Sequence, residues 1–310
     1  MWAAPFDYHY LILDCALPEL RRHWYLLSNH SDSAELLYAD TRFSPMLEIS
    51  PLIARTDYDD PFLSWLYANQ ENVANNWGCL LHSTTSAAAI AEHFRSWITV
   101  RDDIGQEVFF RFYDPDILPH FAAALQGEER QRFFGPVNAF MYRQKGKDLL
   151  AASQAERPKD YDPAKAEPLG PSPCFTLTER YMAAMRPVIW PFLAKEVLTG
   201  LLPKAYFVLN HLSPELMRAK VDECLQVLAR LQNVPIPETE DGVAFCLLAM
   251  TSCSHFYESE EFKSSVLQHG VHETLDEWKS YANAPIPGLE LWHDPKWLEN
   301  DTLNKKMERV

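Results

Sequence analysis

The sequence predicts an α+β or mixed α/β first lobe, in which helices pack on a mixed sheet, followed by an all-α second lobe. Short apolar strand-like segments alternate with amphipathic helical segments through residue 143, whereas apolar residues recur at helical spacing in the last third of the chain. Between these parts, residues 144–173 contain five prolines and almost no large apolar side chain. We therefore expect an α/β domain at residues 1–143, a Pro-rich linker at 144–173 and a helical lobe at 174–310.

The elements of the first lobe follow from hydrophobic periodicity. Strands are expected over 8–13, 34–38, 46–49, 77–81, 107–113 and 135–142. Helices are expected over 17–27, around 62–67 and, with Ser86 as N-cap, over 87–98. In the strand over 107–113, Val108, Phe110 and Phe112 should face one way, and Phe109, Arg111 and Tyr113 the other.

The second lobe should consist of helices. A helix over Thr176–Leu198 contains Pro187 and Pro191, which should kink or divide it. Ser213 followed by Pro214 is a strong N-terminal signal for the next helix. The segment 240–256 is apolar nearly all round, which is typical of a central bundle helix, and a last helix is expected over 271–281.

Composition and charge exclude several classes of function. The chain of 310 residues is 47% hydrophobic and carries 43 acidic against 28 basic residues, a net charge of −15. Nucleic acid and anionic membrane are therefore not expected as partners. The first 143 residues contain ten Arg and no Lys, which fits either fixed ion pairs or a codon bias.

Sequence signals for cofactors, targeting and disulfides are also missing. Neither GxGxxG nor GxxxxGK[ST] occurs, so we expect no nucleotide cofactor. Six cysteines without a CxxC pair indicate buried thiols in a reducing compartment. Residues 1–10 lack a basic leader, and no apolar run approaches the ~20 residues of a membrane span. We expect a cytoplasmic protein.

Few residues point to catalysis or metal binding. No GxSxG elbow is present, and we expect no catalytic residue and no metal. His269 and His272 flank Gly270, which should break the helix, and we interpret them as surface histidines rather than metal ligands. Asp57, Asp59 and Asp60 are interpreted as solvated loop residues.

Three charged residues of the first lobe are candidates for a site. Asp14 ends the first strand, where it could either bind a ligand or satisfy the amides that open the next helix. Arg111 lies among aromatic residues and should pair with a carboxylate such as Asp14 or Asp114, because an unpaired guanidinium there would be costly. Asp114, which is followed by Pro115, should cap the turn by which the chain leaves the strand.

The first lobe carries a series of motifs that resembles a known family. In order, these are YLILD ending at Asp14, SPML at 44–47, WGCLLHS at 77–83, HFR at 93–95, FRFYDP at 110–115 and RFFGPV at 132–137. This series, over about residues 8–143, is similar to that of the type VI secretion effector chaperones, also called adaptors, a family defined by a domain of formerly unknown function. The sequence departs from the family at Ser44, where glycine is usual, and at Asp116, where arginine is usual.

The resemblance implies a non-enzymatic cytoplasmic protein that binds a toxic effector near the effector's N-terminal region and helps load it on the VgrG spike. Effector binding is expected on the first lobe and VgrG contact on the second. The motif residues that could bind the partner, or be structural, are Asp14, Trp77, His93, Arg95, Arg111, Tyr113, Asp114 and Phe134.

Two other functions remain open from the sequence. One is an immunity-type or regulatory protein-binding module. The other is a hydrolase that would use Asp14, His82 or His93, and Asp114, provided that these groups converge in one pocket.

Overall fold

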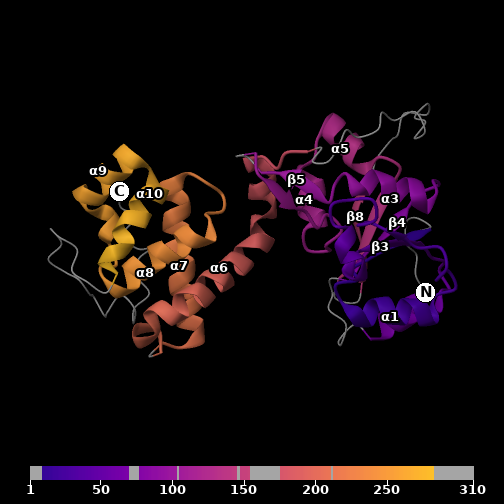
Figure 1. The fold of residues 1–310 in the computed structure, drawn as a ribbon, viewed down its shortest axis with the longest axis horizontal. Helices are drawn as coiled ribbons and strands as arrows, with labels where there is room; N and C mark the ends of the chain where they lie inside the picture. Colours follow the sequence, from indigo (N-terminus) through magenta and orange to yellow (C-terminus); the bar gives the residue numbers. More distant parts are fainter. Residues whose placement is uncertain are drawn as a thin grey trace. The chain divides into compact units, whose positions relative to one another are not determined.

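A computed structural model of the chain describes residues 9–69, 77–102, 105–144, 147–153, 175–210 and 212–282. The chain divides into two units between Met185 and Arg186, which we call unit 1 and unit 2. Figure 1 colours unit 1 from indigo to magenta and unit 2 from orange to yellow.

Unit 1 is built on a six-stranded sheet with the strand order β2-β3-β1-β4-β7-β8. The strands are β1 (Tyr10–Leu13), β2 (Glu35–Leu36), β3 (Leu52–Arg55), β4 (Gly78–His82), β7 (Ala139–Gln144) and β8 (Lys147–Ser153). Each pair of neighbours in this sheet is antiparallel. Leu13 at the end of β1 therefore lies opposite Leu52 and Gly78, the first residues of β3 and β4.

Helices cover both faces of this sheet. Successive strand residues point to opposite sides, so apolar side chains of the strands can pack against helices on each face. On one face, α1 (Pro18–Leu27) and α2 (Pro61–Ala68) share a core with Leu11, Leu13 and Met141. On the other face, α3 (Ala87–Arg95) and α5 (Gly127–Phe134) bring aromatic rings onto Phe140. Figure 1 shows α1 and α3 on opposite sides of the strands.

A smaller sheet completes unit 1. Its strands are β5 (Thr99–Arg101) and β6 (Glu107–Phe109), and α4 (Leu118–Ala124) follows. The backbone of Arg101 hydrogen-bonds with Phe175 and Leu177, and the rings of Phe175 and Tyr181 pack on Phe121. Residues 175–185 therefore belong to unit 1.

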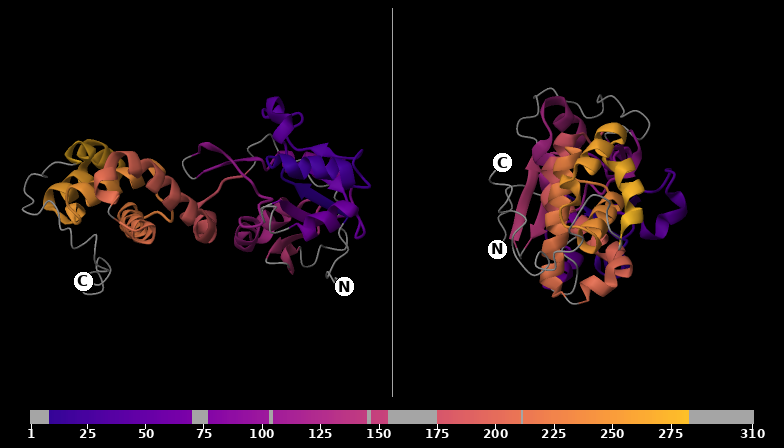
Figure 2. Two further views of the ribbon diagram at one scale, coloured as in Figure 1. Left: turned by 90° about the horizontal axis from the view of Figure 1, so that it is seen from below. Right: turned by 90° about the vertical axis from the view of Figure 1, so that its left-hand side faces the viewer.

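Unit 2 is a helical bundle around one apolar core. Its helices are α6 (Glu179–Leu209, which begins in unit 1), α7 (Pro214–Gln232), α8 (Thr239–Thr251), α9 (Glu260–His269) and α10 (Val271–Trp278), with the short turns η3 (Phe256–Glu258) and η4 (Lys279–Tyr281). The apolar α8 lies in the core, with Phe245, Cys246 and Leu248 fully or nearly fully buried. Both views of Figure 2 show these helices side by side.

The predicted fold class is confirmed, with an α+β first part and a helical second part. The Ser86 and Ser213 N-caps are confirmed, since each hydroxyl accepts a hydrogen bond from the first helical turn. Among the described residues, no helix combines the length and apolar composition that a membrane span requires.

Several local predictions were wrong. Residues 46–49 lie in a 3-10 turn, η1 (Ser44–Ile49), and the strand expected over 107–113 ends at Phe109. The strand β3 at Leu52–Arg55 was not expected. Of the two effects predicted for Pro187 and Pro191, a kink or a division of the helix, the division does not occur, since α6 runs through both and its irregular residue is Ala205.

The predicted domain boundaries also need correction. Residues 147–153 of the expected linker form β8, which pairs with β7, and the first unit extends to Met185 rather than residue 143. The physical reason is that the backbone of Lys147–Ser153 pairs with β7, and sequence composition does not show this pairing. The rest of the expected linker, residues 154–173, lies outside the described residues.

Candidate functional site

An ion pair between distant segments lies at the end of β1. The Nη2 atom of Arg111 is 2.6 Å from Oδ2 of Asp14 and 3.6 Å from Oδ2 of Asp114. The Asp14 side chain is 4% exposed and that of Arg111 is 40% exposed, so the pair joins a buried acid to a base that reaches solvent. The prediction that Arg111 meets one of these carboxylates is confirmed, and it meets both.

The backbone around β1 places Asp14 there. The Asp14 amide donates to the carbonyl of Trp77 (2.7 Å), and the Asp14 Oδ1 accepts from the amide of Ala16 (3.0 Å). Gly78 has a φ of +130°, and a Cβ atom on it would lie 1.9 Å from the carbonyl oxygen of Ile12. Only glycine therefore allows β4 to start this close to β1.

Asp114 has the architectural role that the sequence predicts. Its Oδ1 accepts a hydrogen bond from the amide of Asp116 (2.9 Å), and its carbonyl accepts from Ile117 and Leu118 at the start of α4. Burial raises the pKa of Asp114 in spite of the opposing effects of the Asp116 amide and Arg111. The carboxylate thus holds both the turn and the guanidinium.

Two tyrosines adjoin the ion pair. The guanidinium of Arg111 lies 5.8 Å from the ring centroid of Tyr113, which is buried. Burial raises the pKa of Tyr113 and of Tyr38, and Asp14 adds to both shifts. Burial alone would lower the pKa of Arg111, but Asp14 and the neighbouring groups outweigh this and raise it. Both phenols stay neutral and Arg111 stays charged at physiological pH.

An aromatic cap extends from this cluster to the surface. We use this name for Tyr38, Phe43 and Phe109, whose ring centroids are 5.5–6.0 Å apart. Phe109 is 43% exposed. Arg42 lies over the Phe43 ring, at 5.1 Å, and pairs with Glu107. The cap and Arg111 together present aromatic rings and guanidinium groups to solvent.

Sequence reasoning found only part of this surface. The residues predicted to share one strand face are divided in the structure: Phe109 belongs to the cap, whereas Arg111 and Tyr113 lie past the end of β6, in the ion-pair cluster. Tyr38 and Phe43 were not singled out, because their contacts with Phe109 join segments far apart in the chain. The sequence contains no signal for this pairing beyond the aromatic residues themselves.

Two of the motif residues lie in the cores instead. Trp77 is buried with α1 and α2, and Phe134 is fully buried against Phe133 and Phe140. Their side chains are not on the surface, so their contribution in this structure is to packing.

His93 and Arg95 support the α3 side of the sheet. The Nε2 atom of His93 is 2.9 Å from the carbonyl oxygen of Phe133, and burial lowers the pKa of His93 to about 4. A Cβ atom on Gly135, whose φ is +47°, would lie 2.3 Å from the His93 ring. Arg95 donates to the carbonyl of Leu36 (3.2 Å), which ties α3 to β2, and pairs with Glu92 of its own helix at 3.0 Å.

The remaining polar candidates have local partners. Gly270 ends α9, as predicted, and the Nδ1 of His272 is 2.7 Å from Asp241. Asp57 pairs with His30 at 2.6 Å, and the buried Asp60 caps α2 through the amide of Phe62, so Asp60 is not the solvated residue expected. Within the described part of the chain, no three His, Cys, Asp or Glu side chains form a group that could hold a metal ion.

The chain thus contains an α+β unit, which carries an aromatic and arginine-bearing surface, and a helical unit that follows it. Residues 9–132 match the family model described as a domain of unknown function (DUF4123). No curated protein and no solved structure gives a significant match to the chain.

Proposed function

We propose that this protein is a non-enzymatic cytoplasmic chaperone, or adaptor, that binds a cognate type VI secretion effector and promotes its loading onto the VgrG spike. The observation that carries the proposal is the match of residues 9–132 to the DUF4123 family model. Five of the six motifs that resemble the type VI effector chaperones lie within the same residues, and they add support.

The chemistry of unit 1 suits binding to another protein. Arginine and aromatic residues are enriched at the energetic centres of protein interfaces, and the contacts of Arg42 with Phe43 and of Phe43 with Phe109 bring both kinds together. Arg111 is held by Asp14 and supports this surface from within unit 1. We propose that the aromatic cap binds the N-terminal region of the effector.

The contacts of the motif residues favour binding over catalysis. His93, a base in the hydrolase alternative, contacts the carbonyl of Phe133, and burial lowers its pKa to about 4. Asp14 and Asp114 are both engaged by Arg111. These groups serve the architecture of unit 1, and the proposed function needs no proton transfer from them.

We propose that unit 2 contacts VgrG.

Co-purification from cells that express the full chain and its effector tests the binding surface. The effector to be tested is the large toxin whose gene lies beside a VgrG gene and the gene for this protein. Replacing Phe43 and Phe109 together with Ser should weaken binding at least roughly tenfold, because both rings would leave the interface. The matched control is Leu26→Ser on α1, another exposed apolar side chain of unit 1, which should bind as the wild type does. Equal binding by all three proteins would refute the placement on the aromatic cap.

A further inference from the structure

The smaller sheet of unit 1 has one open edge, which is the outer side of β6. Across the ladder between β5 and β6, the amide of Phe110 donates to the carbonyl of Ile98 (2.7 Å). Inward and outward backbone groups alternate along an antiparallel strand, so the backbone of Val108 also faces β5. The N–H and C=O groups of Glu107 and Phe109 therefore point away from β5.

The opposite edge of the same sheet shows how such outward groups are satisfied. The amide of Arg101 in β5 donates to the carbonyl of Phe175 (2.8 Å), and the carbonyl of Arg101 accepts from the amide of Leu177 (2.7 Å). An extended segment of the chain, parallel to β5, thus completes that edge. On the β6 side, the backbone groups of Glu107 and Phe109 form no hydrogen bond with any residue that the structure describes.

The residues along the open edge are accessible. Glu107 and Phe109 are exposed, and Val108 between them is half-buried. The two outward-facing residues lie about 7 Å apart along the strand and offer two N–H donors and two C=O acceptors in alternation. In a protein partner, the group that matches this pattern is the backbone of another extended segment.

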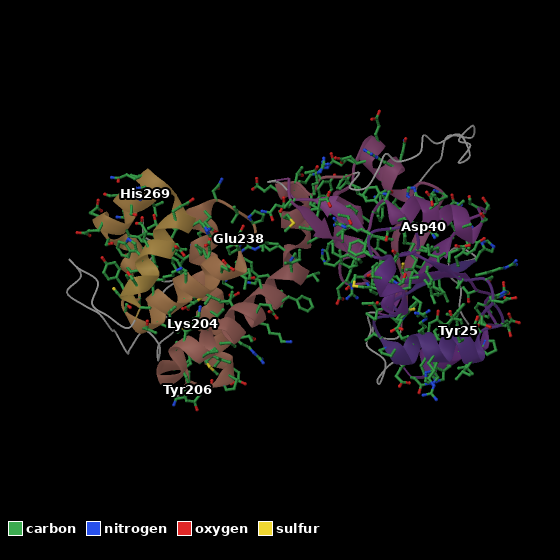
Figure 3. All side chains as sticks on the ribbon, viewed as in Figure 1. Tyr25, Asp40, Lys204, Tyr206, Glu238 and His269 are labelled. Atoms are coloured by element: carbon green, nitrogen blue, oxygen red, sulfur yellow. The ribbon has the colours of Figure 1, made fainter. Side chains whose placement is uncertain are left out.

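The side chains of this edge share a face with the aromatic cap. Glu107 and Phe109 are two positions apart in β6, so their side chains point to the same side of the sheet. The Phe109 ring packs on Tyr38 and Phe43. Asp40, which lies between these two cap residues in the chain, is labelled in Figure 3 and marks this part of unit 1. A strand added beside β6 would therefore place an apolar side chain favourably against Phe109.

We propose that the bound segment of the effector adds to the smaller sheet as an extended strand along the outer edge of β6, with an apolar side chain against Phe109. Its backbone exchanges hydrogen bonds with Glu107 and Phe109, and every second side chain faces the aromatic cap. The backbone contacts then supply affinity, and the cap selects the side chains. This inference rests on the proposed function and specifies the form in which the effector segment is recognised.

A second copy of the chain is the competing occupant of this edge. Two β6 strands paired with each other would also satisfy the outward backbone groups. Each copy carries a net charge of −15, and the exposed Glu107 of both copies would enter the shared ladder. Charge repulsion of this kind is a device that keeps strand edges from pairing with themselves, so the effector segment fits better than a second copy.

Two substitutions at Glu107 separate the backbone from the side chain. Glu107→Ala and Glu107→Pro both remove the carboxylate that pairs with Arg42, but only proline also removes the outward N–H. Proline is tolerated at the first residue of an edge strand, so both full-length variants should keep the wild-type circular dichroism spectrum. Glu107→Ala should bind the purified effector within about threefold of the wild type, whereas Glu107→Pro should bind it roughly tenfold more weakly or worse.

Hydrogen–deuterium exchange of the wild-type chain, with and without the effector, tests the same edge without a substitution. The Val108 amide faces β5 and should be protected in both states. The amides of Glu107 and Phe109 should exchange rapidly in the chain alone and at least roughly tenfold more slowly in the complex, because strand addition gives both amides an acceptor. Should Glu107→Pro lose its fold, these exchange rates decide the question.

The outcomes separate this inference from the proposed function. Equal binding by Glu107→Ala and Glu107→Pro, or unchanged exchange of the Glu107 and Phe109 amides in the complex, would refute strand addition and leave effector binding in place. A wild-type chain that does not bind the effector would refute both. A concentration-dependent dimer, seen by light scattering in the wild type and lost in Glu107→Pro, would assign the edge to a second copy and would also refute the inference.

Discussion

Replacing Arg111 with Ala tests whether the ion pair at the end of β1 is structural. The substitution removes the guanidinium that lies 2.6 Å from Asp14 and leaves that carboxylate with the Ala16 amide as its remaining described hydrogen-bond donor. Because the Asp14 side chain is 4% exposed, water cannot readily replace the lost partner on that side.

The expected loss of stability follows from the burial of the two partners. Removing one member of a fully buried pair costs about 3–5 kcal/mol. The Arg111 side chain is 40% exposed, so solvent screens part of the interaction and we expect about 2 kcal/mol. For a unit of this size, about 2–4 °C per kcal/mol gives a fall in Tm of about 4–8 °C.

Calorimetry at pH 7 on Arg111→Ala, Asp14→Asn and the double variant measures this effect. If the two residues act as a pair, the double variant should lose less stability than the sum of the single losses, with a coupling of about 1–2 kcal/mol. Effector binding should weaken only in step with stability. A folded Arg111→Ala protein with an unchanged Tm and lost effector binding would refute the structural role and make Arg111 a direct contact.

Three other predictions follow from buried or constrained groups. Burial lowers the pKa of His93 from 6.5 to about 4. Acidification across that range therefore protonates His93 only in the unfolded chain, and the urea midpoint of unfolding should fall. In His93→Gln this part of the pH profile should be flatter. Gly78→Ala should prevent folding of unit 1, since its Cβ would lie 1.9 Å from the Ile12 carbonyl oxygen; wild-type soluble yield would refute this. The hydrogen bond and charge of Asp241 raise the pKa of His272. The stability that this pair contributes is therefore fully present below about pH 6.5 and is lost as the pH rises through the raised pKa. Urea midpoints from pH 6 to 9 should show this loss in the wild type but not in His272→Ala.

The ion pair shows how far sequence reasoning reaches. The cost of an unpaired guanidinium among aromatic residues predicted that Arg111 needs a carboxylate. Asp14 lies 97 positions earlier in the chain, and the sequence left it open whether Asp14 or Asp114 is the partner. The answer depends on how the segment after β6 lies against the end of β1, and those two segments meet only in the folded chain.

Local signals were reliable where the chemistry is local. Ser213 caps α7 and Gly270 separates α9 from α10, as predicted, because each effect acts within one turn of chain. The strand β8 was missed because its order comes from pairing with β7, and composition showed only the proline-rich stretch that follows it. The aromatic cap was missed for the same reason, since Phe43 and Phe109 meet only through the fold.

The central claim is that this protein handles a type VI effector and the VgrG spike. Affinity purification of the tagged full chain from a lysate of its native cells, followed by mass spectrometry, tests it most directly. We expect recovery of a VgrG protein together with a large toxin, and reduced recovery of the toxin with the Phe43→Ser, Phe109→Ser variant. Recovery of neither a spike protein nor a toxin from cells that express both would contradict it.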